Sequence, residues 1–93
     1  MTNFEVLISE TAVKQLTELD KDVQTRIKAH FPALKNDPFR NRSGADIKKL
    51  KGFNNPALYR LRVGDYRIVY TIDKTTVKIT ELFRRGKGYS WLD

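Results

Sequence analysis

The sequence has no cysteine and only one histidine in 93 residues. The absence of cysteine excludes disulfides, a thiol nucleophile and cysteine-based metal sites. With one histidine, we do not expect a zinc enzyme or a ribonuclease that uses a pair of histidines. There is no apolar run near the roughly 20 residues that span a bilayer, and the N-terminus is not typical of a signal peptide. We therefore expect a cytoplasmic protein without a metal, a cofactor or a membrane association.

Acidic residues are scarce in the second part of the chain. Overall, 18 Lys and Arg face 11 Asp and Glu, for a net charge of +7. Residues 1–39 have a net charge of −1, whereas residues 40–93 carry thirteen basic and five acidic side chains, a net charge of +8. A surplus confined in this way favours a basic surface for a polyanion such as nucleic acid. A hydrophobic content of 40% is enough for one modest core, so residues 1–93 are predicted to form a single domain.

The first forty residues predict a strand followed by two helices. In residues 3–8, Phe4, Val6 and Ile8 recur at every second position, as on one side of a short strand. Ser9 can cap a first helix and Asp20 a second, because apolar residues recur at helical spacing behind each of them. Pro32 is expected to kink the second helix or to end its regular part. The two helices would form a hairpin whose apolar stripe covers a sheet.

Residues 39–57 show no clear period, and we expect a basic, mobile connection in which Ile47, Leu50 and Phe53 form a short turn of helix. From residue 57 onward the period is two. Gly64-Asp65 has the composition of a two-residue hairpin turn, and a final strand is predicted over residues 76–83. One strand, two helices and a three-stranded antiparallel meander predict an α+β domain with the helices on one face of the sheet.

The predicted hairpin brings three arginines together on one face. With Gly64-Asp65 as the whole loop, Arg62 lies opposite Arg67, and Arg60 is on the same side. We call this side the arginine face, and we expect it to be open and strongly cationic. Two interpretations remain: the arginines bind an anion such as phosphate bidentately, or they spread apart into solvent.

The block Arg62-Val63-Gly64-Asp65-Tyr66-Arg67 within residues 59–70 resembles the RelE/ParE superfamily of bacterial and archaeal toxins. The segment Lys49-Leu50-Lys51-Gly52, the predicted helical hairpin, and a basic tail with Arg85 four residues before Tyr89 are similar to the same superfamily. The resemblance covers essentially the whole chain. It implies a RelE-like fold in the order given above.

The resemblance to the RelE branch implies a toxin of a type II toxin–antitoxin pair. Such a toxin is a ribosome-dependent endoribonuclease, which cuts messenger RNA in the ribosomal A site by metal-independent attack of the 2′-hydroxyl. By position, the catalytic residues would be Arg67, Arg85 and Tyr89. The implied partners are a cognate antitoxin, in a hetero-oligomeric complex, and the ribosome with its messenger RNA. The residues predicted to contact RNA are Lys49, Lys51, Arg60, Arg62, Arg84 and Lys87.

The chain departs from the family pattern near its end. Many members have a histidine where Arg84 stands, and the tail carries no carboxylate before Asp93, so a standard acid–base pair is missing. Glu81 is interpreted as a structural residue that neutralises an arginine. Two other functions stay open: a ParE-like inhibitor of DNA gyrase, and a non-catalytic module that binds RNA or DNA.

The side of the sheet on which the last arginines lie depends on the register of the final strand. A two-residue loop at Lys74-Thr75 with strict alternation places Arg84 on the arginine face. A loop with an odd number of residues, or a bulge near Phe83, places Arg85 there instead. The resemblance favours Arg85.

Overall fold

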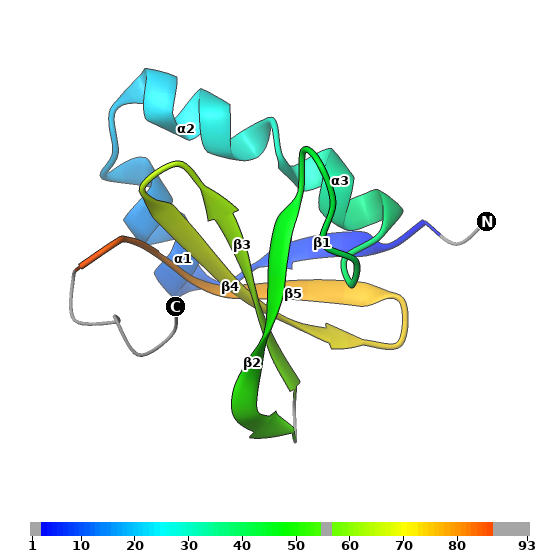
Figure 1. Cartoon of the computed structure of the whole chain (residues 1–93). Coiled ribbons are helices and arrows are strands. Elements are labelled where there is room, and N and C mark those ends of the chain that lie inside the picture. Colours follow the sequence, from blue (N-terminus) through cyan, green and yellow to red (C-terminus); the bar gives the residue numbers. More distant parts are fainter. Residues whose placement is uncertain (1–2, 55–56, 87–93) are drawn as a thin grey trace.

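The computed structural model describes residues 3–54 and 57–86, and for residues 51–54 the backbone alone. Within these residues, five strands form one sheet and three helices pack on it (Figure 1). The strands are β1 (Glu5–Ile8), β2 (Asp46–Asn54), β3 (Ala57–Val63), β4 (Tyr66–Asp73) and β5 (Thr76–Arg84). The helices are α1 (Glu10–Thr17), α2 (Lys21–Lys28) and α3 (Phe31–Asn36). The predicted α+β class is confirmed.

The strands lie in the order β1-β5-β4-β3-β2. Strands β2 to β5 form an antiparallel meander, while β1 runs parallel to β5 at one edge. All three helices contribute to a core on one side of the sheet, which we call the helix face. Its fully buried side chains include Ile27 and Leu34 from the helices and Leu61, Ile68 and Val77 from the strands. The predicted placement of the helices on a single face is therefore confirmed.

The helices begin near the residues that the sequence indicates. Ser9 caps α1, because its Oγ accepts a hydrogen bond from the amide of Ala12 at 3.1 Å. Asp20 stands at the N-cap of α2, but its side chain makes no capping hydrogen bond. The second predicted helix is divided into α2 and α3, and Pro32 lies in the first turn of α3. Its missing amide hydrogen is tolerated there, because the first amides of a helix have no intrahelical acceptor.

The prediction of a mobile connection with a turn of helix around residues 47–53 was wrong, because Asp46–Asn54 form the edge strand β2. Ile47 and Leu50 are three residues apart, a spacing that suggests a helix. In the strand they face opposite sides, Ile47 in the core of the helix face and Leu50 in a small apolar cluster on the other face. Both sides of the strand bury an apolar residue, so the alternation typical of a half-buried strand is lost. The side chain of Phe53 lies outside the described residues.

A bulge changes the phase of β5. Tyr70 pairs with Ile79 and Val69 with Glu81, so Thr80 is an extra residue between these two pairs. Two side chains of α1 bind the backbone of β5 here, beyond the end of β1. The Oγ of Ser9 donates a hydrogen bond to the carbonyl of Thr80 at 2.8 Å, and Oε1 of Gln15 accepts one from the amide of Leu82 at 2.6 Å. The bulge is thus held in place from the helix layer.

Tyr70 anchors the loop that follows α3. Its ring is fully buried and stacks on the ring of Tyr59, with centroids 5.6 Å apart. Its hydroxyl donates a hydrogen bond of 2.7 Å to the carbonyl of Pro38. Burial raises the pKa of Tyr70 well above its ordinary value of 10.0, so the residue stays a neutral donor.

Candidate functional site

The hairpin β3–β4 assembles the arginine face as the sequence predicts. Gly64 and Asp65 form the turn, and Arg62 pairs with Arg67 directly across the two strands. Arg60 pairs with Val69 two residues further along. Gly64 has a φ of 57°, in the left-handed region that a primed hairpin turn requires and that glycine adopts without strain. The predicted register of this hairpin is confirmed.

The arginine face is less open than we expect from the sequence. Arg67 is 3% exposed and Arg60 is 8% exposed, whereas the side chain of Arg62 is half exposed. Nη1 of Arg67 donates to the carbonyls of Gly64 and Tyr66, at 3.1 and 3.3 Å. Arg67 is therefore held at the turn of its own hairpin, which fixes one of two facing cations. The prediction of an open face was wrong at Arg60 and Arg67.

Strand β2 adds two charged residues to the arginine face that the sequence did not indicate. Asp46 lies opposite Arg62, and Lys48 lies opposite Arg60. The carboxylate of Asp46 is 3.3 Å from Nη1 of Arg60 and 4.0 Å from Nη1 of Arg62. Part of the positive charge is therefore neutralised from within the protein, by an anion that lies between two arginines. Only the recognition of β2 as a strand would have revealed this placement.

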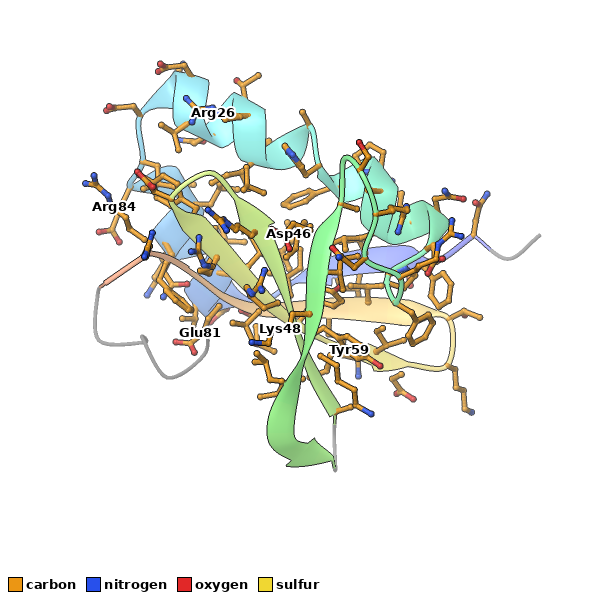
Figure 2. The ribbon with its side chains drawn as sticks, in the orientation of Figure 1. Arg26, Asp46, Lys48, Tyr59, Glu81 and Arg84 are labelled. Atoms are coloured by element: carbon orange, nitrogen blue, oxygen red, sulfur yellow. The ribbon has the colours of Figure 1, made fainter. Side chains whose placement is uncertain are left out.

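The same strand separates the predicted RNA-contacting lysines. Lys49 pairs with Tyr59, and this pair belongs to the helix face, opposite to the arginine face. The side chain of Lys51 lies outside the described residues. Lys48 takes the position on the arginine face, and Figure 2 shows it on the side of the sheet away from α2. The geometry thus favours Lys48 over Lys49 as a neighbour of the arginines.

The bulge in β5 decides which residues of this strand join the arginine face. Arg67 pairs with Phe83, and Glu81 pairs with Val69, so both β5 residues lie on that face. Arg84 pairs with Tyr66 and lies on the helix face. Strict alternation predicted Arg84 on the arginine face, and this placement is wrong because the bulge at Thr80 shifts the pairing by one residue. Arg85 follows the last residue of β5 in a turn, so the strand pairing does not assign its side chain to a face.

Arg84 and Arg85 have different surroundings. Arg84 lines a groove of about 430 Å³, together with Leu19, Tyr66 and residues of α1. The amide of Arg85 donates a hydrogen bond of 2.6 Å to the carbonyl of Asp65, which joins the end of β5 to the hairpin turn. The predicted residues Lys87 and Tyr89 lie outside the described residues. Arg67, Arg60 and Arg62 are brought together by the sheet, and the backbone of Arg85 is bonded to the turn between Arg62 and Arg67.

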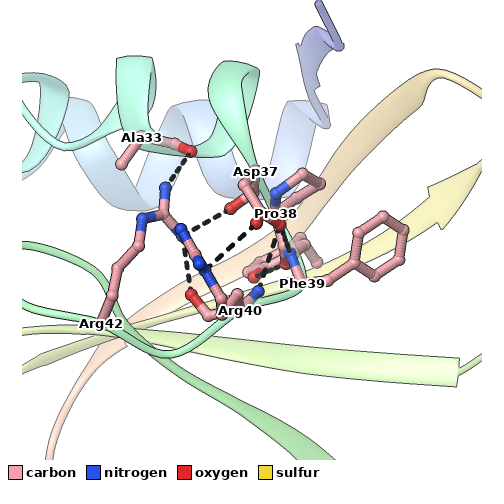
Figure 3. Close-up of polar contacts among 7 residues, drawn as sticks. Ala33, Asp37, Pro38, Phe39, Arg40 and Arg42 are labelled. Atoms are coloured by element: carbon pink, nitrogen blue, oxygen red, sulfur yellow. Dashed lines mark hydrogen bonds and ion pairs between the residues drawn. The ribbon is translucent and has the colours of Figure 1, made fainter. Parts of the chain in front are cut away.

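One of the basic residues, Arg42, binds the backbone at the end of α3 and in the loop that follows (Figure 3). Arg42 donates to the carbonyls of Ala33, Asp37 and Arg40 at 3.0, 2.9 and 2.7 Å. The carboxylate of Asp37 accepts the amide hydrogens of Phe39 and Arg40, and these bonds, the one from Phe39 above all, lower the pKa of Asp37. Arg42 thus closes the end of α3.

The described residues contain neither a metal-binding cluster nor a helix of membrane-spanning length. Across residues 3–54 and 57–86, no three His, Asp or Glu side chains gather closely enough to hold a metal ion. None of the helices in these same residues has the length and apolar character needed to cross a membrane. His30, the single histidine, lies on the helical layer with Nδ1 2.9 Å from the carbonyl of Arg26.

Comparison with known proteins identifies the family. Residues 6–89 match the family described as ParE toxin of type II toxin-antitoxin system, parDE. The chain is also 34% identical, over 86 residues, to Toxin RelE3 of Methanocaldococcus jannaschii. That alignment covers 92% of this chain and 96% of the relative.

Solved structures agree with this result. The chain is similar to the archaeal RelE–RelB complex from Pyrococcus horikoshii OT3, with a TM-score of 0.77, 31% identity and coverage of 94% and 100% of the two chains. It is also similar to the RelB–RelE antitoxin–toxin complex from Methanococcus jannaschii, with a TM-score of 0.72, 31% identity and coverage of 94% and 99%. The sheet that carries the arginine face therefore has the RelE-like toxin fold. The chain belongs to the RelE/ParE superfamily of type II toxin–antitoxin toxins.

Proposed function

We propose that residues 1–93 form a single RelE-like toxin domain, which acts in the cytoplasm as a ribosome-dependent endoribonuclease on messenger RNA. The observation that carries this proposal is the nearly buried Arg67, which the carbonyls of Gly64 and Tyr66 hold on the same face as Arg60 and Arg62. A guanidinium fixed in advance stabilises the added negative charge of a phosphorane better than a mobile one does. Membership of the toxin family supports the same reading.

In the proposed reaction, the 2′-oxygen of a ribose attacks the adjacent phosphorus and the 5′-oxygen leaves. Arg67 and Arg85 stabilise the phosphorane, and Tyr89 completes the catalytic set that the resemblance implies. The ribosome holds the message in place, which supplies the orientation that a site of this kind needs. Neither a metal nor a cofactor takes part. The residues proposed to contact the RNA are Lys49, Lys51, Arg60, Arg62, Arg84 and Lys87, with Lys48 added because it lies opposite Arg60.

The proposed protein partner is a cognate antitoxin in a hetero-oligomeric complex. Solved relatives at 31% identity are complexes of RelE with RelB, and this supports the proposal. The second candidate function is inhibition of DNA gyrase, for which the name of the matching family, ParE toxin, is the specific observation. The two functions differ in target, because the first alone produces cut RNA.

Primer extension on a reporter message in a translating extract tests the proposal. Wild type is expected to cut at defined codon positions when ribosomes are present, and not when they are absent. Arg85→Ala and Tyr89→Phe are expected to weaken the cuts about 100-fold, the scale on which a single stabilising group acts. The control Arg26→Ala removes an exposed arginine from α2 and is expected to leave the cuts unchanged.

Arg84→Ala is the matched comparison for Arg85→Ala, because Arg84 is the adjacent arginine and its partner Tyr66 belongs to the helix face. Arg84→Ala is expected to lower cleavage severalfold through weaker RNA binding. A loss of cutting in Arg84→Ala alone would contradict the assignment of Arg85. If wild type leaves both the message and translation intact, the endoribonuclease proposal fails, and inhibition of supercoiling by gyrase becomes the function to measure.

A further inference from the structure

We propose that Glu81 is the general base that takes the proton from the attacking 2′-hydroxyl. The inference rests on the proposed nuclease function and supplies the proton acceptor that the tail of the chain lacks before Asp93. Sequence reasoning gave Glu81 only a neutralising role. Its position in the sheet, set by the bulge in β5, argues for a chemical one.

The sheet register puts Glu81 among the arginines. Glu81 pairs with Val69 on β4, and Val69 pairs on its other side with Arg60 on β3. Two residues along β5, Phe83 pairs with Arg67. Glu81, Val69 and Arg60 therefore lie side by side across three neighbouring strands. Arg67 is the diagonal neighbour of Glu81 on β4. A phosphate held by these two arginines would have its ribose next to Glu81.

The surroundings of Glu81 suit a proton acceptor. Val69, Phe83 and Leu50 form an apolar cluster on the arginine face, and each of them is less than a tenth exposed. Glu81 itself is half-buried beside this cluster. Arg67 and Glu81 each make a further interaction. The backbone of the strand fixes where the Glu81 side chain begins, and partial burial limits its contact with water.

Two other carboxylates on this face are placed less well. Asp46 lies at the outer edge strand, and its carboxylate is already shared by Arg60 and Arg62. Asp73 lies at the far end of β4, where its carboxylate is 3.6 Å from Nζ of Lys78. Among the described residues of the arginine face, Glu81 is thus the carboxylate on the strand that leads directly into the catalytic arginine of the tail.

The proton balance of the step closes without a metal. Glu81 takes the proton of the 2′-hydroxyl while the 2′-oxygen forms its bond to phosphorus. The bond from phosphorus to the 5′-oxygen then breaks, which leaves a 2′,3′-cyclic phosphate on one fragment. The departing 5′-oxygen takes a proton from water, and the hydroxide so formed removes the proton from Glu81. The carboxylate is regenerated, and the second fragment ends in a 5′-hydroxyl.

Single-turnover cleavage on programmed ribosomes, with toxin in excess, tests the inference. Glu81→Gln is expected to cut at least about 100-fold more slowly, in the range attributed to general acid–base groups, while RNA affinity stays equal or increases. Glu81→Ala is expected to regain at least about tenfold of its rate on addition of formate, a small carboxylate that can accept the proton. Chloride at equal ionic strength is expected to restore nothing. Glu5→Ala, at an exposed position of β1, is the control and is expected to match wild type.

Each other outcome overturns the inference. Rates within about threefold of wild type for both Glu81 variants would show that no proton passes through this residue. Equal rescue of Glu81→Ala by formate and chloride would show that the carboxylate only balances charge. Failure of wild type to cut would remove the proposed function and this inference with it. Thermal unfolding of each variant confirms that it is folded at the assay temperature.

Discussion

The two faces of the same sheet are buried in different ways. On the helix face, Leu61 and Ile68 are fully buried against apolar side chains of the helices. On the arginine face, Arg60 and Arg67 are nearly as buried, yet they carry positive charge. Neighbours along one strand, such as Leu61 and Arg62, thus lie in opposite environments.

The two kinds of burial have opposite effects on the stability of the fold. Removal of an apolar side chain from water stabilises the fold, whereas burial of a cation costs free energy unless hydrogen bonds and opposite charges offset it. Arg67 obtains that compensation from two backbone carbonyls and Arg60 from Asp46. An apolar pair would fill this face at lower cost. Retained cations at such positions are typical of a site kept for binding or catalysis.

The largest expected effect comes from the neighbouring pair Leu61 and Arg62. Leu61→Ala leaves a cavity in the core and is expected to lower the free energy of unfolding by about 2–5 kcal/mol. Arg62→Ala removes a half-exposed side chain and is expected to change it by about 0.5 kcal/mol or less. Chemical denaturation of both variants measures the difference. Equal losses would contradict the division between the two faces.

Tyr70→Phe tests a polar contact inside the helix face. The variant loses the hydrogen bond to the carbonyl of Pro38 and is expected to be about 1 kcal/mol less stable. In wild type, the unfolded chain ionises Tyr70 near pH 10, but the folded chain keeps its proton because burial raises the pKa. Stability therefore falls as the pH rises above 10, and the fall is expected to be shallower in the variant. Denaturation midpoints measured between pH 8 and pH 11 test this prediction. If the midpoint falls with pH equally in the two proteins, the prediction is wrong.

The smallest expected effect concerns the charge balance of the arginine face. Asp46→Asn removes the carboxylate between Arg60 and Arg62 and is expected to tighten binding to single-stranded RNA severalfold at low salt. The dependence of the binding constant on salt is expected to become steeper. Asp73→Asn, which removes a carboxylate of the same face far from these arginines, serves as the control. Identical binding by both variants would mean that Asp46 does not limit access to the arginines.

Much of the fold could be predicted from local patterns. The alternation in residues 57–72 and the Gly64-Asp65 turn were sufficient for the hairpin register, since a two-residue loop leaves only one pairing. Ser9 likewise indicated the start of α1. These features depend on neighbours in the sequence, and for that reason the sequence alone contains them.

The features missed depend on contacts between distant segments. Strand β2 is recognised through its pairing with β3, and its apolar residues Ile47 and Leu50 lie on opposite faces, so no single period marks it. Ser9 binds the extra residue Thr80 and Gln15 binds the nearby Leu82, although each contact joins residues more than sixty positions apart along the chain. Assignment of Glu81 to a face therefore required the folded sheet.

The bulge also has a consequence for how such chains diverge. Which side the last residues of β5 occupy depends on the number of residues between Thr76 and Glu81, and not on which amino acids they are. A deletion of Thr80 would move the β5 residues after it, Glu81 to Arg84, to the opposite faces of the sheet without altering any of them. A change of length in this short segment therefore transfers charged side chains between the two faces without a single substitution.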